Sequence, residues 1–224
     1  MGRPKRTDLG GLVYHVLNRA NAQMTIFESD ADYGAFETVV AAAVERVSMR
    51  LLAYCVMPNH WHLVLHPRKD GDLSRFMTWL TLTHTQRWHA HRSTAGAGHL
   101  YQGRYKSFVT QSDEHMLSLC RYVERNALRA KLVSAAERWP WCSLWRRTFG
   151  NAESKALLSA WPVDRPRAWR RWVNKPQSED ELHAIRHCIT RGRPFGAQPW
   201  VSRTAARLGL ETTIRPRGRP KQND

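Results

Sequence analysis

The sequence predicts an α+β fold, in which a ferredoxin-like antiparallel sheet carries helices on one face. Two observations lead to this prediction. Short apolar, β-rich runs are separated by longer segments with helical periodicity. Their order is strand, helix, strand, strand, helix, strand, helix, and it contains the split βαβ arrangement of that fold class. The chain has 224 residues, which suits one sizeable domain with an appendage.

The predicted elements begin with a strand, a long helix and a hairpin. Apolar residues alternate over residues 12–18, as in a half-buried strand. Ser29 can cap the next helix, whose apolar positions recur at helical spacing up to Val47. Residues 50–57 and 61–65 are β-rich runs around a Pro-Asn turn signal, which predicts a β-hairpin.

A second helix, a fourth strand and a third helix complete the predicted sheet. Asp72 can cap the second helix, which ends at the glycine-rich segment 93–98. Residues 104–110 alternate as a strand, and Ser112 can cap the third helix, on which Tyr122 lies.

The chain divides into three predicted parts. Residues 1–137 hold the elements above and form the predicted catalytic domain. Residues 138–190 are rich in tryptophan and proline, and Ser178 and Glu181 form a capping box that begins another helix. Residues 191–224 are basic and punctuated by proline and glycine. The last two parts together predict a basic, mostly helical C-terminal extension.

The charge of the chain predicts a polyanionic partner. Lys and Arg number 35 against 19 Asp and Glu, which gives a formal net charge of +16 and a pI near 10.6. Such an excess attracts nucleic acids, with binding that weakens as salt rises. The ten tryptophans and six tyrosines can stack on unpaired bases, although aromatic side chains serve equally well in a core.

The cysteines and the hydropathy pattern exclude several classes of protein. Cys55, Cys120, Cys142 and Cys188 form no Cys-x-x-Cys pair, so neither a zinc knuckle nor a disulfide framework is indicated. Reduced thiols are typical of a cytoplasmic protein. No run of about eighteen apolar residues is present, and the sequence predicts neither secretion nor a membrane span.

A pair of histidines begins the predicted strand at residues 61–65. Side chains at i and i+2 of a strand point to one face, so His60 and His62 can share a metal ion or, alternatively, simply line the strand end. His66 points to the same face but lies roughly 13 Å farther along the strand, too far to be a ligand. The second pair, His89 and His91, falls in a helical pattern where i and i+2 diverge, which favours a structural role.

Tyr122 and Asn126 are spaced by four residues on the predicted third helix and share one of its faces. A helix that presents them beside the histidine pair would assemble a cation site with a phenol next to it. A divalent ion there would act as a Lewis acid on phosphate, and the phenol could attack a phosphodiester. A free phenol has a pKa of about 10, so the metal and cations such as Lys106, Arg121 or Arg125 would have to activate it.

The motif around the histidines resembles a known signature. His60-Trp61-His62 is similar to the His-hydrophobe-His motif of the HUH endonuclease superfamily, and residues 54–62 resemble its single-tyrosine, IS200-like transposase branch. More narrowly, nearly the full chain resembles the REP-associated tyrosine transposases of bacteria. The segments that carry this resemblance are Gly2-Arg3-Pro4, Tyr14-His15-Val16-x-Asn18-Arg19, Gln102-Gly103-Arg104-Tyr105-Lys106-Ser107, Tyr122-x-x-x-Asn126 and Arg191-Gly192-Arg193-Pro194-Phe195-Gly196.

The resemblance implies an enzyme that binds single-stranded or hairpin DNA of the REP type. Tyr122 would cut one strand and leave a 5′-phosphotyrosine and a free 3′-OH, and the reverse reaction would rejoin strands. A Mg²⁺ or Mn²⁺ ion would be held by His60, His62 and Asn126. One position departs from the family pattern, because Asn-Pro is common there and Ala127 follows Asn126 here, so the helix can run on.

Basic residues spread over the chain are the expected DNA contacts. They are Arg3, Lys5, Arg6, Arg104, Lys106, Arg121, Arg125, Arg191, Arg193, Arg217, Arg219 and Lys221. The run Arg217-Gly218-Arg219-Pro220 resembles the core of an AT-hook, which lies in a narrow minor groove, but a solubilising tail would look the same.

Other interpretations of the sequence remain open. A transposase-derived protein that binds DNA without cutting it would keep the same motifs. A zinc hydrolase with Tyr122 as a bystander would need a third strong ligand, and no Asp or Glu stands at a suitable spacing. Tyr101 and Tyr105 are other candidate nucleophiles, although neither has an amide residue one turn later. We expect a nucleoid-associated protein that is a monomer or a homodimer.

Overall fold

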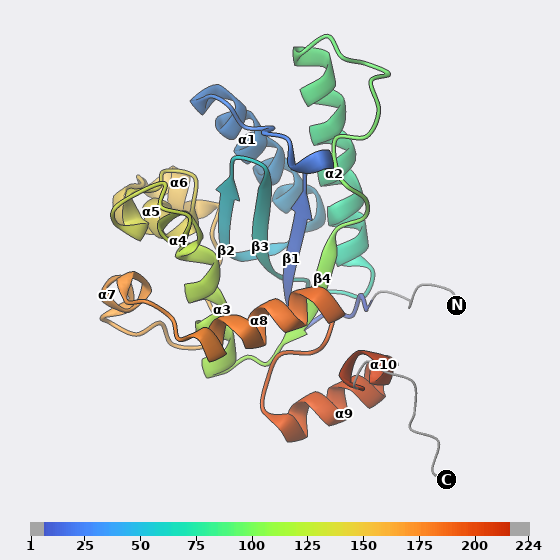
Figure 1. Cartoon of the computed structure of the whole chain (residues 1–224), viewed down its shortest axis with the longest axis vertical. Helices are drawn as coiled ribbons and strands as arrows, with labels where there is room; N and C mark the ends of the chain where they lie inside the picture. Colours follow the sequence, from blue (N-terminus) through green and yellow to red (C-terminus); the bar gives the residue numbers. More distant parts are fainter. Residues whose placement is uncertain (1–6, 216–224) are drawn as a thin grey trace.

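The computed structural model describes residues 7–215, and its centre is a four-stranded antiparallel sheet with strand order β2-β3-β1-β4 (Figure 1). The strands are β1 (Val13–Arg19), β2 (Arg50–Met57), β3 (His60–His66) and β4 (Lys106–Thr110). This order confirms the predicted α+β fold with a ferredoxin-like sheet. β2 and β3 form the predicted hairpin, since Met57 pairs with His60 across a two-residue turn.

The helices follow the predicted order and then continue beyond it. They are α1 (Asp30–Val47), α2 (Asp72–His91), α3 (Glu114–Glu124), α4 (Asn126–Arg129), α5 (Ser143–Phe149), α6 (Ala152–Ala156), α7 (Trp169–Asn174), α8 (Glu179–Arg191), α9 (Gln198–Leu208) and α10 (Glu211–Ile214). Short 3-10 turns lie at Asn21–Gln23 and Ala136–Arg138.

Two of the four predicted helix caps are confirmed, and two are wrong by one residue. Ser29 and Ser178 each accept a hydrogen bond from the third backbone N–H of their helix within a full capping box. Gly71, in a left-handed conformation with φ of 82°, caps α2, and the carboxylate of Asp72 turns back to accept from the Lys69 N–H at 2.8 Å. Asp113 caps α3 in place of Ser112.

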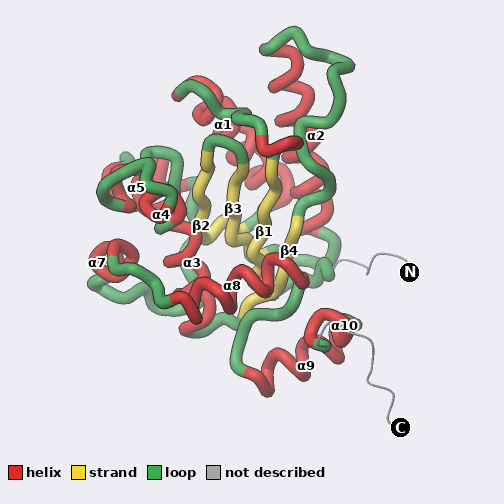
Figure 2. The backbone as a smooth tube through the Cα atoms, in the orientation of Figure 1, coloured by secondary structure: helices red, strands yellow, loops and turns green. Residues whose placement is uncertain are grey.

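Helices cover both faces of the sheet, which corrects the prediction of helices on one face. α1 and α2 pack on the face that carries Leu63 and Leu65, whereas α3, α7 and α8 pack on the face that carries Val64 and Phe108. Strands that are apolar on both sides must be covered on both sides. Figure 2 shows α8 crossing the sheet on the second face, where it contacts β4 and α3.

The tryptophan-rich segment covers the edge strand β2. The indole N–H groups of Trp139 and Trp161 donate to the carbonyls of Val56 and Leu52 at 2.8 and 2.7 Å. The Val56 N–H in turn donates to the carbonyl of Trp141 at 2.9 Å. These bonds occupy backbone groups that an open edge would expose to pairing with another chain.

The segment that follows α8 is folded as far as residue 215. The predicted helical character of the basic C-terminal extension is confirmed here, since α9 and α10 form in this segment, and Gly192 ends α8 with φ of 68°. Phe195 pairs with Thr110 in a parallel bridge beside β4. Arg191 donates to the carbonyls of Thr213 and Arg215 and so ties α10 to the end of α8.

All four cysteines are buried as free thiols. Their positions on β2, α3, α8 and the approach to α5 place them inside the packing of the second sheet face. No helix within residues 7–215 is long and apolar enough to cross a bilayer.

Candidate active site

A pocket of about 970 Å³ opens on the second face of the sheet. β1, β3, the segment before β4, the α3–α4 helix and α8 each contribute to its wall. The lining residues with polar or charged side chains are Asn18, Arg19, His60, His62, Gln102, Arg104, Lys106, Tyr122, Asn126, Arg129, Arg186 and Thr190. Thus the structure brings together six of the candidate site residues that the sequence singled out, namely His60, His62, Arg104, Lys106, Tyr122 and Asn126, from three separate segments.

The histidine pair lies at the start of β3, as its spacing predicted. The rings of His60 and His62 project from one face of the strand with their centroids 5.1 Å apart. The ring of Tyr122 stands edge-on to His62 at 5.9 Å. The phenol and the two imidazoles therefore form one cluster, built by a strand and by the helix packed over it.

One ring nitrogen of His60 and one of His62 are hydrogen-bonded to neighbouring side chains. His60 Nδ1 is hydrogen-bonded to Asn59 Oδ1 at 2.6 Å, and His62 Nδ1 is hydrogen-bonded to His15 Nε2 at 2.8 Å. Each bond fixes the ring orientation and leaves the Nε2 atoms of His60 and His62 as the potential donors to a metal ion. No sequence motif pointed to His15 or Asn59 for this role, although His15 lies two residues before Leu17, the β1 residue that pairs with His62.

Burial keeps the imidazoles uncharged. It lowers the pKa of His15 to about 3 and that of His60 to about 4, and for His60 the charges of Arg19 and Arg129 add to the effect. Burial also brings the pKa of His62 well below its usual value, with smaller contributions from His15 and His60. Neutral imidazole is the form that binds metal ions.

Tyr122 and Asn126 lie one helical turn apart, because only Arg125 separates the end of α3 from the start of α4. The helix does run on past Asn126, and it brings Arg129 over the phenol ring at 4.2 Å from the ring centroid. Arg129 also donates to Asn126 Oδ1 at 2.7 Å. Sequence reasoning missed Arg129, although its spacing of seven from Tyr122 is a helical-face signal.

The Asn126 amide has a defined orientation. A guanidinium has only donors, so the atom that faces Arg129 must be Oδ1. Asn126 is 6% exposed, and its Nδ2 has no hydrogen-bond partner among the described residues. Oδ1 has two lone pairs and keeps one for a further interaction.

This donor set fits a divalent metal ion. Two imidazole nitrogens and one lone pair of an amide oxygen line the same pocket, and as ligands they would leave further coordination positions open. The amide oxygen is shared with Arg129, so the histidines supply the stronger donors. Among residues 7–215, none of the charged side chains in the pocket lining is a carboxylate, so the phosphate of a substrate would meet no negative charge there.

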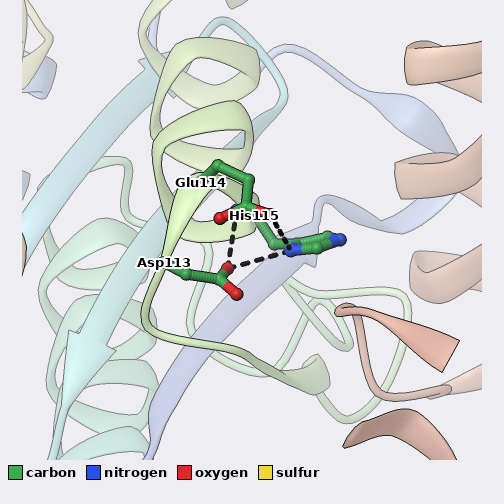
Figure 3. Close-up of side chains that lie close together, drawn as sticks. All are labelled: Asp113, Glu114 and His115. Atoms are coloured by element: carbon green, nitrogen blue, oxygen red, sulfur yellow. Dashed lines mark hydrogen bonds and ion pairs between the residues drawn. The ribbon is translucent and has the colours of Figure 1, made fainter. Parts of the chain in front are cut away.

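A separate group of acidic and histidine side chains lies at the first turn of α3 (Figure 3). Asp113 accepts from the His115 N–H at 2.8 Å and from His115 Nδ1 at 2.9 Å, and Glu114 lies 3.8 Å from the same ring nitrogen. Helix capping accounts for this arrangement. The group is not part of the pocket lining.

The expected DNA contacts fall into four groups. Arg104 and Lys106 line the pocket. Arg121 and Arg125 do not reach it, since both donate to backbone carbonyls of residues 172–176. Arg191 binds carbonyls of residues 212–215, and Arg193 donates to Gln198 Oε1 at 3.0 Å. Arg3, Lys5, Arg6, Arg217, Arg219 and Lys221 lie outside the described residues.

The other histidines and tyrosines considered have structural surroundings. Tyr101 is buried, where its hydroxyl accepts from the Trp61 indole at 3.0 Å and is hydrogen-bonded to His84 at 2.6 Å. His89 is hydrogen-bonded to Thr94 at 2.8 Å. His66 is buried at the far end of β3 and, like Tyr101, does not line the pocket.

Comparison with known proteins identifies the class. Residues 9–126, slightly more than half of the chain, match the family model of the IS200-like transposases. The chain therefore belongs to the IS200-like transposase family, whose members act on DNA. The matched residues include the histidine pair, Tyr122 and Asn126 and end at Asn126.

Among solved structures, the fold is similar to that of a REP-associated tyrosine transposase bound to a REP hairpin. The two chains share 14% identity with a TM-score of 0.54, over 80% of this chain and 93% of the other. A Deinococcus radiodurans R1 protein classed as a transposase shares 17% identity over 59% of this chain and 94% of its own, with a TM-score of 0.39. Comparison with curated proteins gave no match.

Proposed function

We propose that the chain is a metal-dependent single-strand DNA endonuclease and strand transferase with Tyr122 as its nucleophile. The observation that carries this proposal is the position of the Tyr122 ring, 5.9 Å from the His62 ring in a pocket whose charged side chains are cations. A phenol beside a metal-binding pair suits covalent phosphoryl transfer. Hairpin DNA of the REP type is the proposed substrate, supported by the REP hairpin bound to the similar structure.

The proposed reaction balances as a phosphodiester exchange. The phenol oxygen of Tyr122 bonds to phosphorus as the bond between phosphorus and the 3′-oxygen breaks. The phenol proton passes to water, and the departing 3′-oxygen takes up a proton. The products are a 5′-phosphotyrosine and a 3′-OH, and attack by a 3′-OH on the phosphotyrosine reverses the step.

The side chains around Tyr122 have distinct roles in this proposal. His60 and His62, with Asn126 as the weaker third donor, would hold Mg²⁺ or Mn²⁺. When bound, such an ion supplies Lewis-acid stabilisation of the charge that builds on the phosphate oxygens. Arg129 holds the Tyr122 ring and the Asn126 amide in place, so that neither must reorganise during the reaction.

The test is the covalent adduct formed by Tyr122. A hairpin oligonucleotide labelled at its 3′ end is incubated with protein and Mg²⁺ and run on a denaturing gel, where label on the protein band reports the 5′-phosphotyrosine. We expect Tyr122→Phe to form no adduct and to keep its DNA affinity within a few-fold, because the hydroxyl is the nucleophile and adds little phosphate attraction. Tyr33→Phe on α1, on the other sheet face, is the matched control and should form adduct at the normal rate.

An adduct formed by Tyr122→Phe would remove Tyr122 from the mechanism. Tight binding of the hairpin without any cleavage by the wild type would instead favour a DNA-binding protein that has lost catalysis.

The metal ligands are tested separately by His60→Ala and His62→Ala. Each removes one of few donors, and we expect cleavage to fall by orders of magnitude in both. Asn126→Ala should cost less, because water can replace an amide oxygen that is already shared with Arg129. EDTA should abolish cleavage by the wild type, and undiminished cleavage in EDTA would contradict the metal assignment.

A further inference from the structure

We infer that α8 forms one wall of the DNA-binding pocket and that Arg186 contacts a backbone phosphate of the bound strand. This inference rests on the proposed function, because it places a DNA strand beside Tyr122. The family match ends at Asn126, so it does not extend to α8. The ligand is the phosphodiester backbone of a single DNA strand. Arg186 would extend the DNA-binding site from the family-matched region into the C-terminal extension.

The first observation is that α8 contributes directly to the pocket. Arg186, Ile189 and Thr190 lie on one face of the helix, and all three line the same pocket as His60 and Tyr122. The adjoining face of α8 is buried against the second core cluster through Leu182 and Ile185, which lie one turn before Arg186 and Ile189. The orientation of α8 is therefore set by packing, and Arg186 is left exposed on the pocket side.

The second observation is the distribution of charge around the pocket. Arg19 comes from β1, and Arg104 and Lys106 come from the start of β4 and the segment just before it. Arg186 comes from α8, and Arg129 from α4, which continues the helix that carries Tyr122. Cations gathered this closely repel one another unless an anion lies between them, so the pocket is suited to a phosphate chain.

The third observation is that the nucleophile helix fixes α8. Arg121, next to Tyr122 in sequence, has a side chain only 5% exposed that donates to Glu181 Oε1 on α8 at 3.1 Å. It also donates to the carbonyls of Lys175 and Pro176, just before α8, at 2.9 Å each. Tyr122 and Arg186 are thereby held in one rigid frame, as two contacts on a single strand require.

The test measures how DNA binding depends on salt. Binding of a short fluorescent single strand is followed by anisotropy over a series of salt concentrations in EDTA, so that neither the metal nor cleavage affects the result. We expect Arg186→Gln to make the plot of the logarithm of the binding constant against the logarithm of the salt concentration less steep. The magnitude of its negative slope should fall by roughly 0.7, the value for one phosphate contact on a single strand. Arg186→Lys keeps the charge and should restore the slope.

Arg87→Gln is the matched control. Arg87 is an exposed arginine on α2, which packs on the other sheet face, so the same change of net charge should leave the slope at the wild-type value. A wild-type slope in Arg186→Gln would overturn the inference, as would equal losses in both variants, which would indicate an effect of net charge alone. The assay needs neither cleavage nor metal. The effect of Arg186→Gln on the salt slope can therefore be measured even if the protein proves to have no endonuclease activity.

Discussion

Glu124 ties α3, the helix that carries Tyr122, to the C-terminal extension through one carboxylate. It is fully buried two residues after Tyr122, and it accepts hydrogen bonds from the Ser143 hydroxyl and the Trp169 indole at 2.6 Å each. Burial raises the pKa of the Glu124 carboxyl. The position of α3 therefore depends on a side chain that does not line the pocket.

We expect Glu124→Ala to lower the free energy of unfolding by about 2–4 kcal/mol, because it leaves the buried indole N–H of Trp169 unpaired and opens a cavity, while the Ser143 hydroxyl can still donate to the Tyr54 carbonyl. Urea unfolding followed by tryptophan fluorescence measures the change. Glu124→Gln keeps an acceptor and should cost less. Glu153→Gln, at an exposed position on α6, should change nothing measurable, and a similar loss there would contradict the role of burial.

His15 acts on the proposed metal site only through His62. We expect His15→Ala to weaken the response to metal about 10–100-fold, since it frees the orientation of the His62 ring. The measurement is the Mn²⁺ concentration that gives half-maximal cleavage, compared with DNA binding in EDTA, which should stay at the wild-type value. An unchanged Mn²⁺ requirement would show that the hydrogen bond between His15 and His62 does not support the metal site.

At the scale of the elements, α3 serves two functions through two of its faces. One face presents Tyr122 to the pocket, and the other presents Arg121 to the connection between α7 and α8. The sequence suggested Arg121 and Arg125 as DNA contacts because a cation next to a candidate nucleophile resembles a phosphate ligand. Only the packing of a distant segment reveals that backbone carbonyls occupy both guanidinium groups.

We expect Arg121→Met to destabilise the protein by about 3–5 kcal/mol, because it removes the buried partner of Glu181 and of several carbonyls. Thermal and urea unfolding report the loss. Arg75→Met, on an exposed arginine that pairs with Asp72, is the control and should cost less than about 1 kcal/mol. An equally small effect at Arg121 would show that α8 is held by its apolar face alone.

α9 presents two exposed arginines, Arg203 and Arg207, within the segment expected to contact hairpin DNA. If α9 meets the duplex stem, Arg203→Gln with Arg207→Gln should lower the salt slope of hairpin binding by up to about 1.8. Binding of a short single strand should not change, because it needs only the pocket. Equal slopes on the hairpin for the double variant and the wild type would remove α9 from the DNA contact.

At the scale of the whole molecule, the sheet and the first three helices could be predicted because their signals are local. Alternating strands, capping serines and the Pro-Asn turn all act within a few residues. The covering of the second face could not be predicted, since it depends on contacts between segments about a hundred residues apart, such as Trp161 with Leu52. The same holds for the site, where spacing predicts His60, His62, Tyr122 and Asn126, while Arg186 enters only through packing.

Stability should fall as the solution becomes acidic. Burial lowers the pKa of His84 from 6.5 to about 3. Between these two pH values the His84 imidazole is therefore protonated in the unfolded chain and neutral in the folded chain. The free energy of unfolding should thus be highest above pH 6.5 and decline toward pH 3, by about 1.4 kcal/mol per pH unit for each such group. His84→Gln removes one titrating group, and its decline should be shallower when unfolding is measured across this range.

The burial of all four thiols has a practical consequence for chemical labelling. Burial raises the pKa of Cys55 and of Cys188 to about 12, so at neutral pH the folded chain offers no accessible thiolate to an alkylating reagent. A native cysteine that reacts therefore indicates that the molecule has unfolded locally or globally. The rate of alkylation then measures the rate or extent of this unfolding. A single cysteine introduced at an exposed position, such as Arg87→Cys, would then carry a dye without competition from the native thiols.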